Sequence, residues 1–253
     1  MSLALYPALK IGDTERKLRE SISRITTGLN ILGGSGGAFA QGIGIKAEAD
    51  SNHQVASTSK VAQDFLLTAE AALVELAALA TRLRELGIAD TSSTNSASDT
   101  AALNASAVAV SDSIDDIVSS LQFNNINVLD TSAVTKTTPK DVDGNLTTIK
   151  TTEGIAATNI TDATNSNTTA DTALASITTS MGHVSGHLTS LQAYGDVSSS
   201  ISAIEMQSAA RLMDTNFAME TAKLLKNSLI SSYAHNMVSE ANDIERKKLI
   251  LLA

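Results

Sequence analysis

The chain of 253 residues has no cysteine and no tryptophan, and aromatic residues make up only 3% of it. Without cysteine, neither a disulfide framework nor a thiolate metal site can form. Pockets for small ligands are usually lined with aromatic side chains, so the composition argues against an enzyme. The apolar fraction of 43% consists mainly of Ala, Leu, Ile and Val, which favours long helices packed along aliphatic faces.

Basic residues are also few. The 18 Lys and Arg stand against 27 Asp and Glu, which gives a net charge of −9 and a pI near 4.9. Nucleic acid binding needs clustered Lys and Arg to displace counterions, so we expect no nucleic acid partner. No run reaches the roughly 18 apolar residues that span a bilayer, and we expect no membrane insertion. The N-terminus has no basic segment ahead of its short apolar run, so it does not predict a cleavable signal peptide.

Four segments carry apolar residues alternately three and four positions apart. This spacing places them on one narrow stripe of a helix, which is typical of helices that pack lengthwise in a coiled coil. Because such rows occur in both halves of the chain, the simplest arrangement folds the C-terminal half back antiparallel to the N-terminal half. The predicted fold is therefore mainly α, a long antiparallel coiled-coil-like helical rod with a small β-hairpin insertion. The rows are Ile11, Leu18, Ile22, Ile25, Leu29 and Leu32; Leu66, Ala69, Leu73, Leu76, Ala80 and Leu83; Leu103, Ala107, Val110, Ile114, Ile117 and Leu121; and Leu174, Ile177, Met181, Val184, Leu188 and Leu191.

The segment between the third and fourth rows is rich in Thr, Asn and Asp. Thr and Val favour strands, and Asp143-Gly144 is a strong two-residue hairpin turn. We therefore expect a small β-hairpin followed by a surface-exposed loop. The Ser-rich and Thr-rich stretch from Thr91 to Thr100 predicts the break between the second and third helices. The predicted organisation is terminal helices at 1–32 and 201–253, a glycine-rich segment at 33–46, a helical rod at 47–130 and 172–200, and the insertion at 131–171.

Six of the 14 glycines lie between residues 33 and 44, and such a run raises the question of phosphate binding. A P-loop needs Lys and Ser or Thr directly after its last glycine, but Ile43 and Gly44 follow GAFAQG. The dinucleotide-binding pattern in GIGIKA has no strand before it. We therefore interpret the segment as a joint, where glycine supplies backbone freedom between two helical segments. Its glycines are Gly33, Gly34, Gly36, Gly37, Gly42 and Gly44.

The remaining candidate sites match their chemical templates poorly. His183 and His187 are four residues apart, but a zincin needs Glu directly after the first histidine, where Val184 stands. The DVDGN sequence that begins at Asp141 resembles the start of a calcium loop, but Leu146 occupies the position that requires glycine. No nucleophile, base and orienting group share a local spacing. We expect no metal site, no cofactor and no catalytic residue.

Several motifs, taken in order, resemble those of one protein family. SISRITTGLNI, at residues 21–31, is similar to the N-terminal signature of bacterial flagellins. The helix at residues 67–86, with its RLREL ending, and QFNNINVLD, at residues 122–130, resemble the next two elements of that family. ARLMDTNFAMETAKLLKNSL, at residues 210–229, and the closing LILLA resemble its C-terminal helix and apolar tail. These motifs lie within residues 1–130 and 172–253, which is most of the chain.

The resemblance implies a structural subunit that polymerises head to tail into the bacterial flagellar filament for swimming motility. It implies an extracellular homopolymer, exported by the flagellar type III apparatus, with a chaperone at the C-terminal tail and with filament cap and junction proteins as partners. A hook–filament junction protein with flagellin-like termini is the alternative. The glycine-rich segment falls at the spoke that joins two helical layers in the family, although that spoke is usually polar and charged. The implied packing and polymerisation residues are Leu18, Ile22, Ile25, Leu29, Leu66, Leu73, Leu76, Leu83, Ile114, Ile117, Phe123, Phe217, Leu224, Leu225 and Leu229.

The resemblance also implies a surface for an immune receptor. The innate immune receptor for flagellin reads an Arg-X-Arg-Glu-Leu helix, which here corresponds to Arg82, Arg84 and Leu86. A Glu on the following helix belongs to the same surface in the family, and Ser106 stands in its place. We therefore expect weak recognition.

Overall fold

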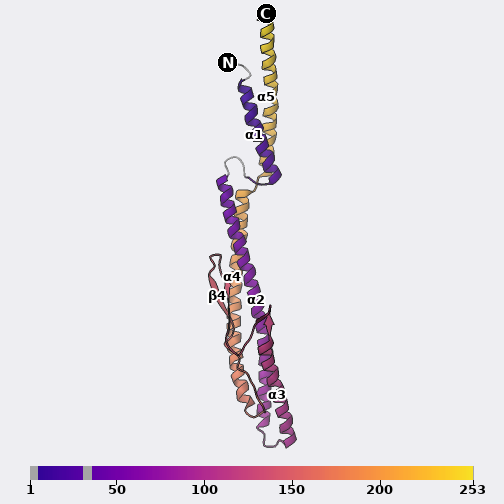
Figure 1. The fold of residues 1–253 in the computed structure, drawn as a ribbon, viewed down its shortest axis with the longest axis vertical. Coiled ribbons are helices and arrows are strands. Elements are labelled where there is room, and N and C mark those ends of the chain that lie inside the picture. Colours follow the sequence, from indigo (N-terminus) through magenta and orange to yellow (C-terminus); the bar gives the residue numbers. More distant parts are fainter. Residues whose placement is uncertain (1–4, 31–35, 253) are drawn as a thin grey trace. The chain divides into compact units, whose positions relative to one another are not determined.

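The structure, a computed structural model, describes residues 5–30 and 36–252. Helices account for most of these residues, and two small hairpins interrupt them (Figure 1). The predicted helical fold with a small β insertion is therefore confirmed. The elements are α1 (Leu5–Thr27), α2 (Gly36–Asp90), α3 (Ala97–Ser120), β1 (Gln122–Phe123), β2 (Ile126–Asn127), β3 (Val134–Pro139), β4 (Leu146–Thr152), α4 (Ser166–Met213) and α5 (Phe217–Leu252).

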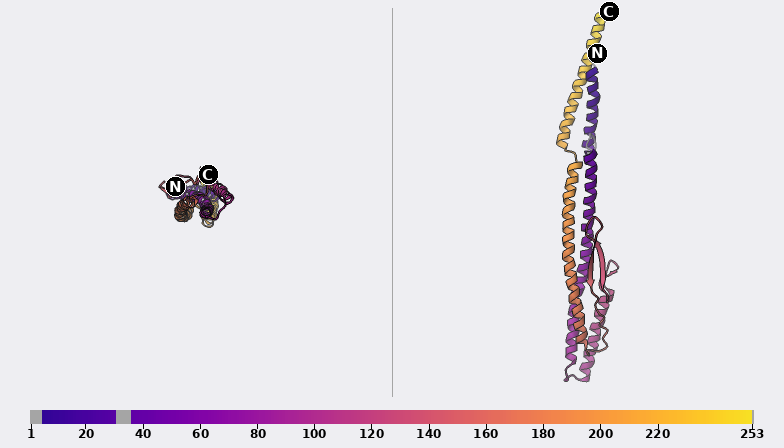
Figure 2. Two further views of the ribbon diagram at one scale, coloured as in Figure 1. Left: turned by 90° about the horizontal axis from the view of Figure 1, so that it is seen from below. Right: turned by 90° about the vertical axis from the view of Figure 1, so that its left-hand side faces the viewer.

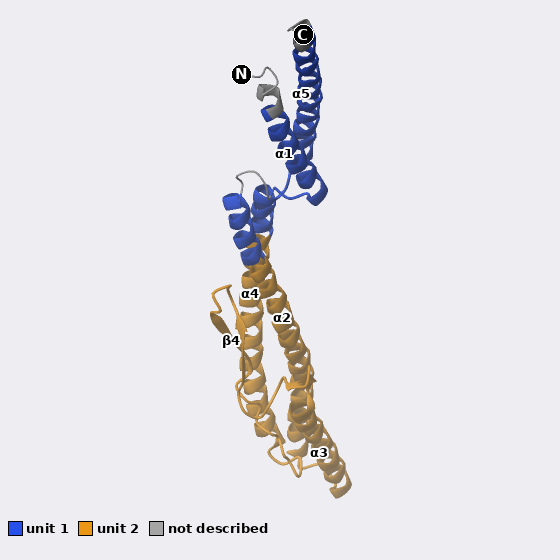
Figure 3. Cartoon of the chain, turned by 45° about the horizontal axis from the view of Figure 1, so that its top comes forward, with its two compact units in different colours: residues 1–49, 203–253 blue, residues 50–202 orange. Residues whose placement is uncertain are grey.

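The chain divides into two compact units (Figure 3). Unit 1 comprises Met1–Ala49 and Ala203–Ala253, and unit 2 comprises Asp50–Ser202. Helices α2 and α4 each contribute residues to both units.

The core of unit 2 is built on one face of α2. All six residues of the second predicted row, from Leu66 to Leu83, are fully buried. They pack with Ile114 of α3 and with Ile177 and Val184 of α4, in the rows that the three-and-four spacing predicts. Figure 2 shows α2 and α4 side by side in this unit.

Close contacts show that α2 and α4 run antiparallel in unit 2. Gly87, near the end of α2, lies against Asn167 at the beginning of α4. Further along, Ser59 of α2 lies near Gly195 of α4. A residue late in one helix thus meets a residue early in the other. The predicted antiparallel packing of the two halves is present here.

The break between α2 and α3 is shorter than predicted. Ser96 is the N-cap of α3, because its hydroxyl accepts a hydrogen bond from the Asp99 backbone NH at 3.3 Å. The Asp99 carboxylate accepts one in return from the Ser96 backbone NH at 2.9 Å, which completes a capping box. The helix therefore begins at Ala97, inside the stretch that we assigned to the break.

The predicted hairpin is formed by β3 and β4, paired antiparallel from Val134 and Thr152 to Pro139 and Leu146. Its turn is not the expected two-residue turn. Gly144 does have a positive φ of 80°, but the Asp141 carboxylate accepts a hydrogen bond from the Asn145 backbone NH at 3.0 Å. That bond closes a longer loop over residues 140–145.

A two-residue turn occurs instead between β1 and β2. Asn124 and Asn125 connect these strands with φ angles of 49° and 63°. Asparagine tolerates this left-handed region better than most residues, and two such residues in sequence give the hairpin turn whose twist suits paired strands. The predicted element at residues 122–130 is thus a second hairpin.

The segment after β4, predicted to be an exposed loop, is in part buried. Ile155 and Ala163 lie in the core of unit 2. The Asp115 carboxylate of α3 accepts hydrogen bonds from the backbone NH groups of Thr158 at 2.8 Å and Asn159 at 3.1 Å. These bonds hold the segment against α3. Helix α4 then begins at residue 166, earlier than the predicted 172.

In unit 1 the glycine-rich segment is largely helical, which corrects its interpretation as a joint. Gly36, Gly37, Gly42 and Gly44 belong to α2, whereas Gly33 and Gly34 lie outside the described residues. At Gly42 an added Cβ would lie 2.4 Å from Cγ of Met213. This glycine is needed because two helices approach closely, and not because the backbone must bend.

The helices of unit 1 are interrupted at residues 28–30 and 214–216, and backbone hydrogen bonds join these two segments. Gly28 ends α1 with a positive φ of 72°, as is common after a helix C-terminus. The Asn30 NH donates to the Met213 carbonyl at 2.7 Å, and the Thr215 NH donates to the Gly28 carbonyl at 2.8 Å. Helix α4 runs unbroken past Ile201, where we expected a boundary.

Replacing Gly87 with Ala should destabilise unit 2 by about 1–3 kcal/mol, because the new Cβ would lie 2.4 Å from the Asn167 backbone N and the Ser166 Oγ. Gly186 is the matched control, since it is also helical and an added Cβ there meets nothing within 4 Å. Gly186→Ala should stabilise the protein by up to about 1 kcal/mol. Urea unfolding followed by circular dichroism measures both changes. Equal stability of Gly87→Ala and wild type would show that the helices do not approach this closely.

Candidate assembly surfaces

The buried positions in the contact between α1 and α5 of unit 1 are small or polar, whereas apolar residues such as Leu224 are half-buried. Among the residues whose burial is described, Thr14 and Ser21 are buried on α1, and Glu220 and Ala234 are buried on α5. Leu18 is half-buried beside them. In the α1 row that we predicted from apolar spacing, Ile11, Leu18, Ile25 and Leu29 are half-buried, whereas Ile22 is exposed and its neighbour Ser21 is buried instead. Leu32, the last member of that row, lies outside the described residues.

Glu220 is the buried carboxylate of this pair, with 4% of its surface exposed. Its Oε1 accepts hydrogen bonds from the Ser21 hydroxyl at 2.9 Å and from Arg24 Nη1 at 3.1 Å, while Lys223 Nζ lies 3.2 Å from Oε2. Burial by itself raises the pKa of Glu220. The hydrogen bonds from Ser21 and Lys223 and the charges of Lys223 and Arg24 outweigh burial, so the pKa is lowered. At neutral pH this carboxylate is ionised.

Several large apolar side chains of α5 face away from α1, although Leu224 is half-buried. Leu225, for example, is 65% exposed. These residues recur four and seven positions apart and so lie along one side of the helix, which we call the exposed stripe of α5. Exposed apolar patches of this kind mark sites of association. The stripe consists of Leu225, Leu229, Tyr233, Met237 and Ile244.

The predicted packing residues fall into three groups. Within unit 2, Leu66, Leu73, Leu76, Leu83 and Ile114 are fully buried, with Ile117 and Phe123 packed against them. Within unit 1, Leu18, Ile25, Leu29 and Leu224 are half-buried, and Ile22, Phe217, Leu225 and Leu229 are exposed.

The polar residues of the α1–α5 contact were not predicted from the sequence. Ser21, Arg24 and Glu220 all lie inside the motifs that carry the family resemblance, but a search for apolar spacing passes over them. A usable signal is present, because Glu220, Leu224 and Asn227 repeat at the three-and-four spacing along α5. A carboxylate at such a position indicates a buried partner of opposite charge.

Arg82, Arg84 and Leu86 do not share one face of α2. Arg82 and Arg84 are exposed, and they form ion pairs with Glu85 at 3.0 Å and with Asp171 at 2.8 Å. Leu86 is only 4% exposed and belongs to the core of unit 2. Its inclusion in a receptor surface was therefore wrong. Leu86 lies three residues after Leu83 and so shares the buried face of α2, whereas Arg82 and Arg84 lie on exposed faces.

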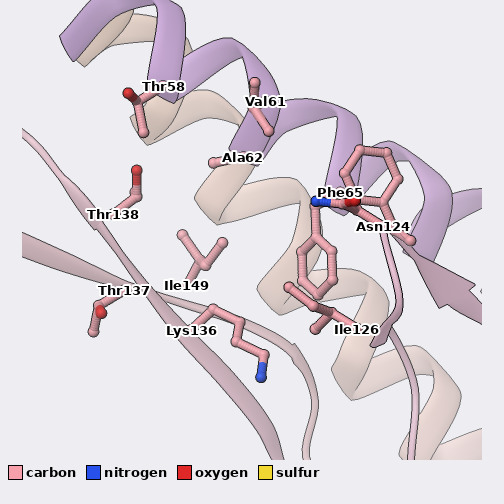
Figure 4. Close-up of a pocket in the computed structure, with 11 residues that line it drawn as sticks. Thr58, Val61, Ala62, Phe65, Asn124, Ile126, Lys136, Thr137, Thr138 and Ile149 are labelled. Carbon is pink, nitrogen blue, oxygen red and sulfur yellow. The ribbon is translucent and has the colours of Figure 1, made fainter. Parts of the chain in front are cut away.

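A hollow of about 340 Å³ lies in unit 2 between α2 and the two hairpins (Figure 4). The rings of Phe65 and Phe123 meet edge to face in its wall, with centroids 6.0 Å apart. Lys136 is the charged residue of its lining, and the buried Thr138 hydroxyl there has no hydrogen-bond partner. The hollow offers apolar surface and one cation.

The two predicted histidines lie beside the end of β4. Glu153 Oε1 is 2.6 Å from Lys150 Nζ and 2.7 Å from His183 Nε2. The hydrogen bonds of Lys150 and then His183 lower the pKa of Glu153. Burial, followed by the charges of His183 and Lys150, lowers the pKa of His187. Among the residues that the structure describes, no three acidic or histidine side chains converge to hold a metal ion.

The described helices contain no segment that is both long and apolar enough to cross a membrane. What they present is a packed helical unit and a helix pair with apolar side chains left on its surface. These features define a helical protein with surfaces for association.

Comparisons with known proteins identify the family. The family model of the bacterial flagellin N-terminal helical region matches residues 2–134, more than half of the chain. The chain therefore belongs to the bacterial flagellin family, and it is a structural protein of the flagellar filament. The crystal structure of Bacillus cereus flagellin is similar at 22% identity, with a TM-score of 0.39, over 57% of this chain and 86% of that one. No curated protein matches.

The contact between α1 and α5 should weaken in acid. Because the pKa of Glu220 is lowered in the folded chain, its contribution is fully present above the unfolded value of about 4.3 and is lost as the pH falls through the folded value. The difference in melting temperature between wild type and Glu220→Gln should therefore be largest above about pH 5 and should close below it. The exposed Glu240→Gln is the control and should follow wild type. A difference that stays constant down to about pH 3 would contradict a role for the carboxylate charge.

Proposed function

We propose that this chain polymerises head to tail into the bacterial flagellar filament and that the filament serves swimming motility. The observation that carries the proposal is the exposed stripe of α5. Its five large apolar side chains are turned away from α1, so they gain burial only from another molecule. Membership of the flagellin family supports a second copy of the same chain as that molecule.

A helical polymer places a geometric requirement on the contact between its subunits. A filament needs one heterologous contact that repeats without closing. An apolar stripe on one surface that meets a different surface of the next subunit satisfies this condition. Burying a side chain the size of Leu, Tyr or Met contributes about 1.5–3 kcal/mol, so several such residues supply enough to hold neighbouring subunits together.

The other partners follow from the same role. Apolar residues near the C-terminus, among them Ile250, which is 76% exposed, need a chaperone before export through the flagellar type III apparatus. After export, the subunit meets the filament cap and the junction proteins outside the cell. The exposed arginines Arg82 and Arg84 remain the proposed immune-receptor contact.

The growth of filament seeds distinguishes a filament subunit from a junction protein with flagellin-like termini. Purified protein added to short filament seeds should elongate them without limit if it is the filament subunit. A junction protein would add a single layer and stop. Negative-stain electron microscopy of seeded reactions separates these outcomes.

Two charges placed on the exposed stripe should prevent growth. We expect Leu229→Asp combined with Met237→Asp to abolish elongation, because burying unpaired carboxylates at a subunit contact is strongly unfavourable. The melting temperature of the free protein should change by less than about 2 °C, since both side chains are already exposed.

Ser228→Asp is the matched control, because Ser228 is exposed on α5 and lies off the stripe. It should elongate seeds as wild type does. Normal filaments from the double variant would remove the stripe from the polymer contact.

A further inference from the structure

The shapes of α1 and α5 do little to define how the two helices align along their length. The buried positions Thr14, Ser21 and Ala234 are small. A slip of α5 by one heptad would place Asn227 where Glu220 lies and Ala241 where Ala234 lies. At these two buried positions each exchange brings in a smaller or equal side chain. At the half-buried positions Ser231 would take the place of Leu224, and Val238 the place of Ser231. Steric fit at the buried positions therefore discriminates weakly between registers.

A slip of α5 would break the backbone bonds at the base of the pair. They join residues 28–30 to residues 213–215 through NH and carbonyl groups. Every residue except proline carries the same two groups, so other residues can replace these backbone bonds after a slip. Side-chain contacts are specific to one register, among them the cap in which Asn216 Oδ1 accepts from the Met219 NH at 3.1 Å and the contact of Glu220.

We propose that Glu220 is the positioning residue that fixes the register of α1 against α5. In the observed register its Oε1 accepts hydrogen bonds from Ser21 and Arg24. A slip by three residues would instead bring Lys223 towards Arg24, with like charges facing each other. The next carboxylate on the same face of α5 is Glu245, 25 residues further along.

A buried ionic contact suits this task better than it suits stabilisation. Desolvation of the two charges offsets much of their attraction, whereas removal of one partner leaves an expensive unpaired charge. Single buried polar residues are known to select the register of paired helices for this reason. The pair of Glu220 and Arg24 therefore penalises wrong alignments, while it adds little to stability in comparison with an apolar pair at the same two positions.

This inference deepens the proposed function and rests on it for its consequence. The exposed stripe of α5 has a defined position beside α1 only when the register is unique. A repeating contact requires that every subunit present the same surface. Subunits with mixed registers would present different surfaces and would end a growing filament.

The absence of cysteine makes the register measurable. Glu15 and His235 lie opposite each other, with Oε1 and Nε2 separated by 3.8 Å, and both are largely exposed. Glu15→Cys with His235→Cys reports the observed register. Glu15→Cys with Ser228→Cys or with Asn242→Cys reports a slip of one heptad in either direction. A short bifunctional maleimide links each pair, and peptide mapping of the single chain quantifies the yield at low protein concentration.

The deciding variant combines Arg24→Leu with Glu220→Leu. We expect the ratio of observed-register to slipped cross-links to fall about tenfold or more, the factor that hydrogen bonds to charged groups supply. The melting temperature should stay the same or rise, because apolar residues often replace a buried ion pair without loss. A purely structural role predicts the opposite pattern, namely a lower melting temperature and an unchanged ratio.

Glu220→Asp keeps the carboxylate and should retain most of the observed-register cross-link, and the exposed Glu240→Leu should have no effect. An unchanged ratio in the Arg24→Leu, Glu220→Leu variant would overturn the proposal, as would failure of the otherwise unaltered chain to cross-link at 15 and 235. These measurements use single chains and do not depend on filaments. A shifted ratio in a chain that never elongates seeds would support the register role and reject the proposed function.

Discussion

A long helix can bury only part of its circumference, and the choice of which part to bury controls both units of this chain. In unit 2, α2 turns its aliphatic row inward and its charged residues outward. In unit 1, α5 does the reverse, because it turns Glu220 and Ala234 towards α1 and Leu225 and Leu229 towards the surface. The same helical periodicity therefore yields a self-contained core in one unit and an association surface in the other.

This difference has an energetic consequence. Unit 2 buries large aliphatic side chains from three helices, which is the dominant favourable term in folding. The α1–α5 pair buries small residues and an ionic contact, and such contacts contribute little net free energy. If neighbouring subunits cover the exposed stripe, as proposed, the pair is the part of the chain that gains most from them, and its folding is then coupled to assembly.

Hydrogen bonds from polar side chains hold the irregular segments of unit 2 in place. The segment after β4 has no regular structure up to residue 165, yet its backbone NH groups are bonded to Asp115, and Asn104 Oδ1 accepts from Ala163 at 2.8 Å. Thr151 donates its hydroxyl to the Val128 carbonyl. These bonds satisfy backbone groups that burial would otherwise leave without partners. The Thr151 bond also joins β4 to the segment that follows β2.

The sequence predicted best what apolar spacing alone determines. The α2 row was recovered residue for residue, because a fully buried helix face leaves an uninterrupted pattern. The α1 row was placed one position off at Ile22, because the true contact uses Ser21, and a polar residue at a buried position gives no apolar signal. Glu220 was missed for the same reason, since its burial depends on Ser21 and Arg24, which are distant in sequence. The turn at Asn124 was missed because glycine usually marks such sites.

The glycine-rich segment shows how one residue type can serve two purposes. Glycine inside a helix costs about 1 kcal/mol relative to alanine, so its presence there needs a reason. At Gly42 and Gly87 the reason is contact, because a Cβ would meet Met213 in one case and the Asn167 backbone in the other. Gly36 and Gly37 have open space around them, so close packing does not account for these two. A glycine can be needed for flexibility or for close packing, and the sequence looks the same in both cases. The position of the neighbouring helix distinguishes the two.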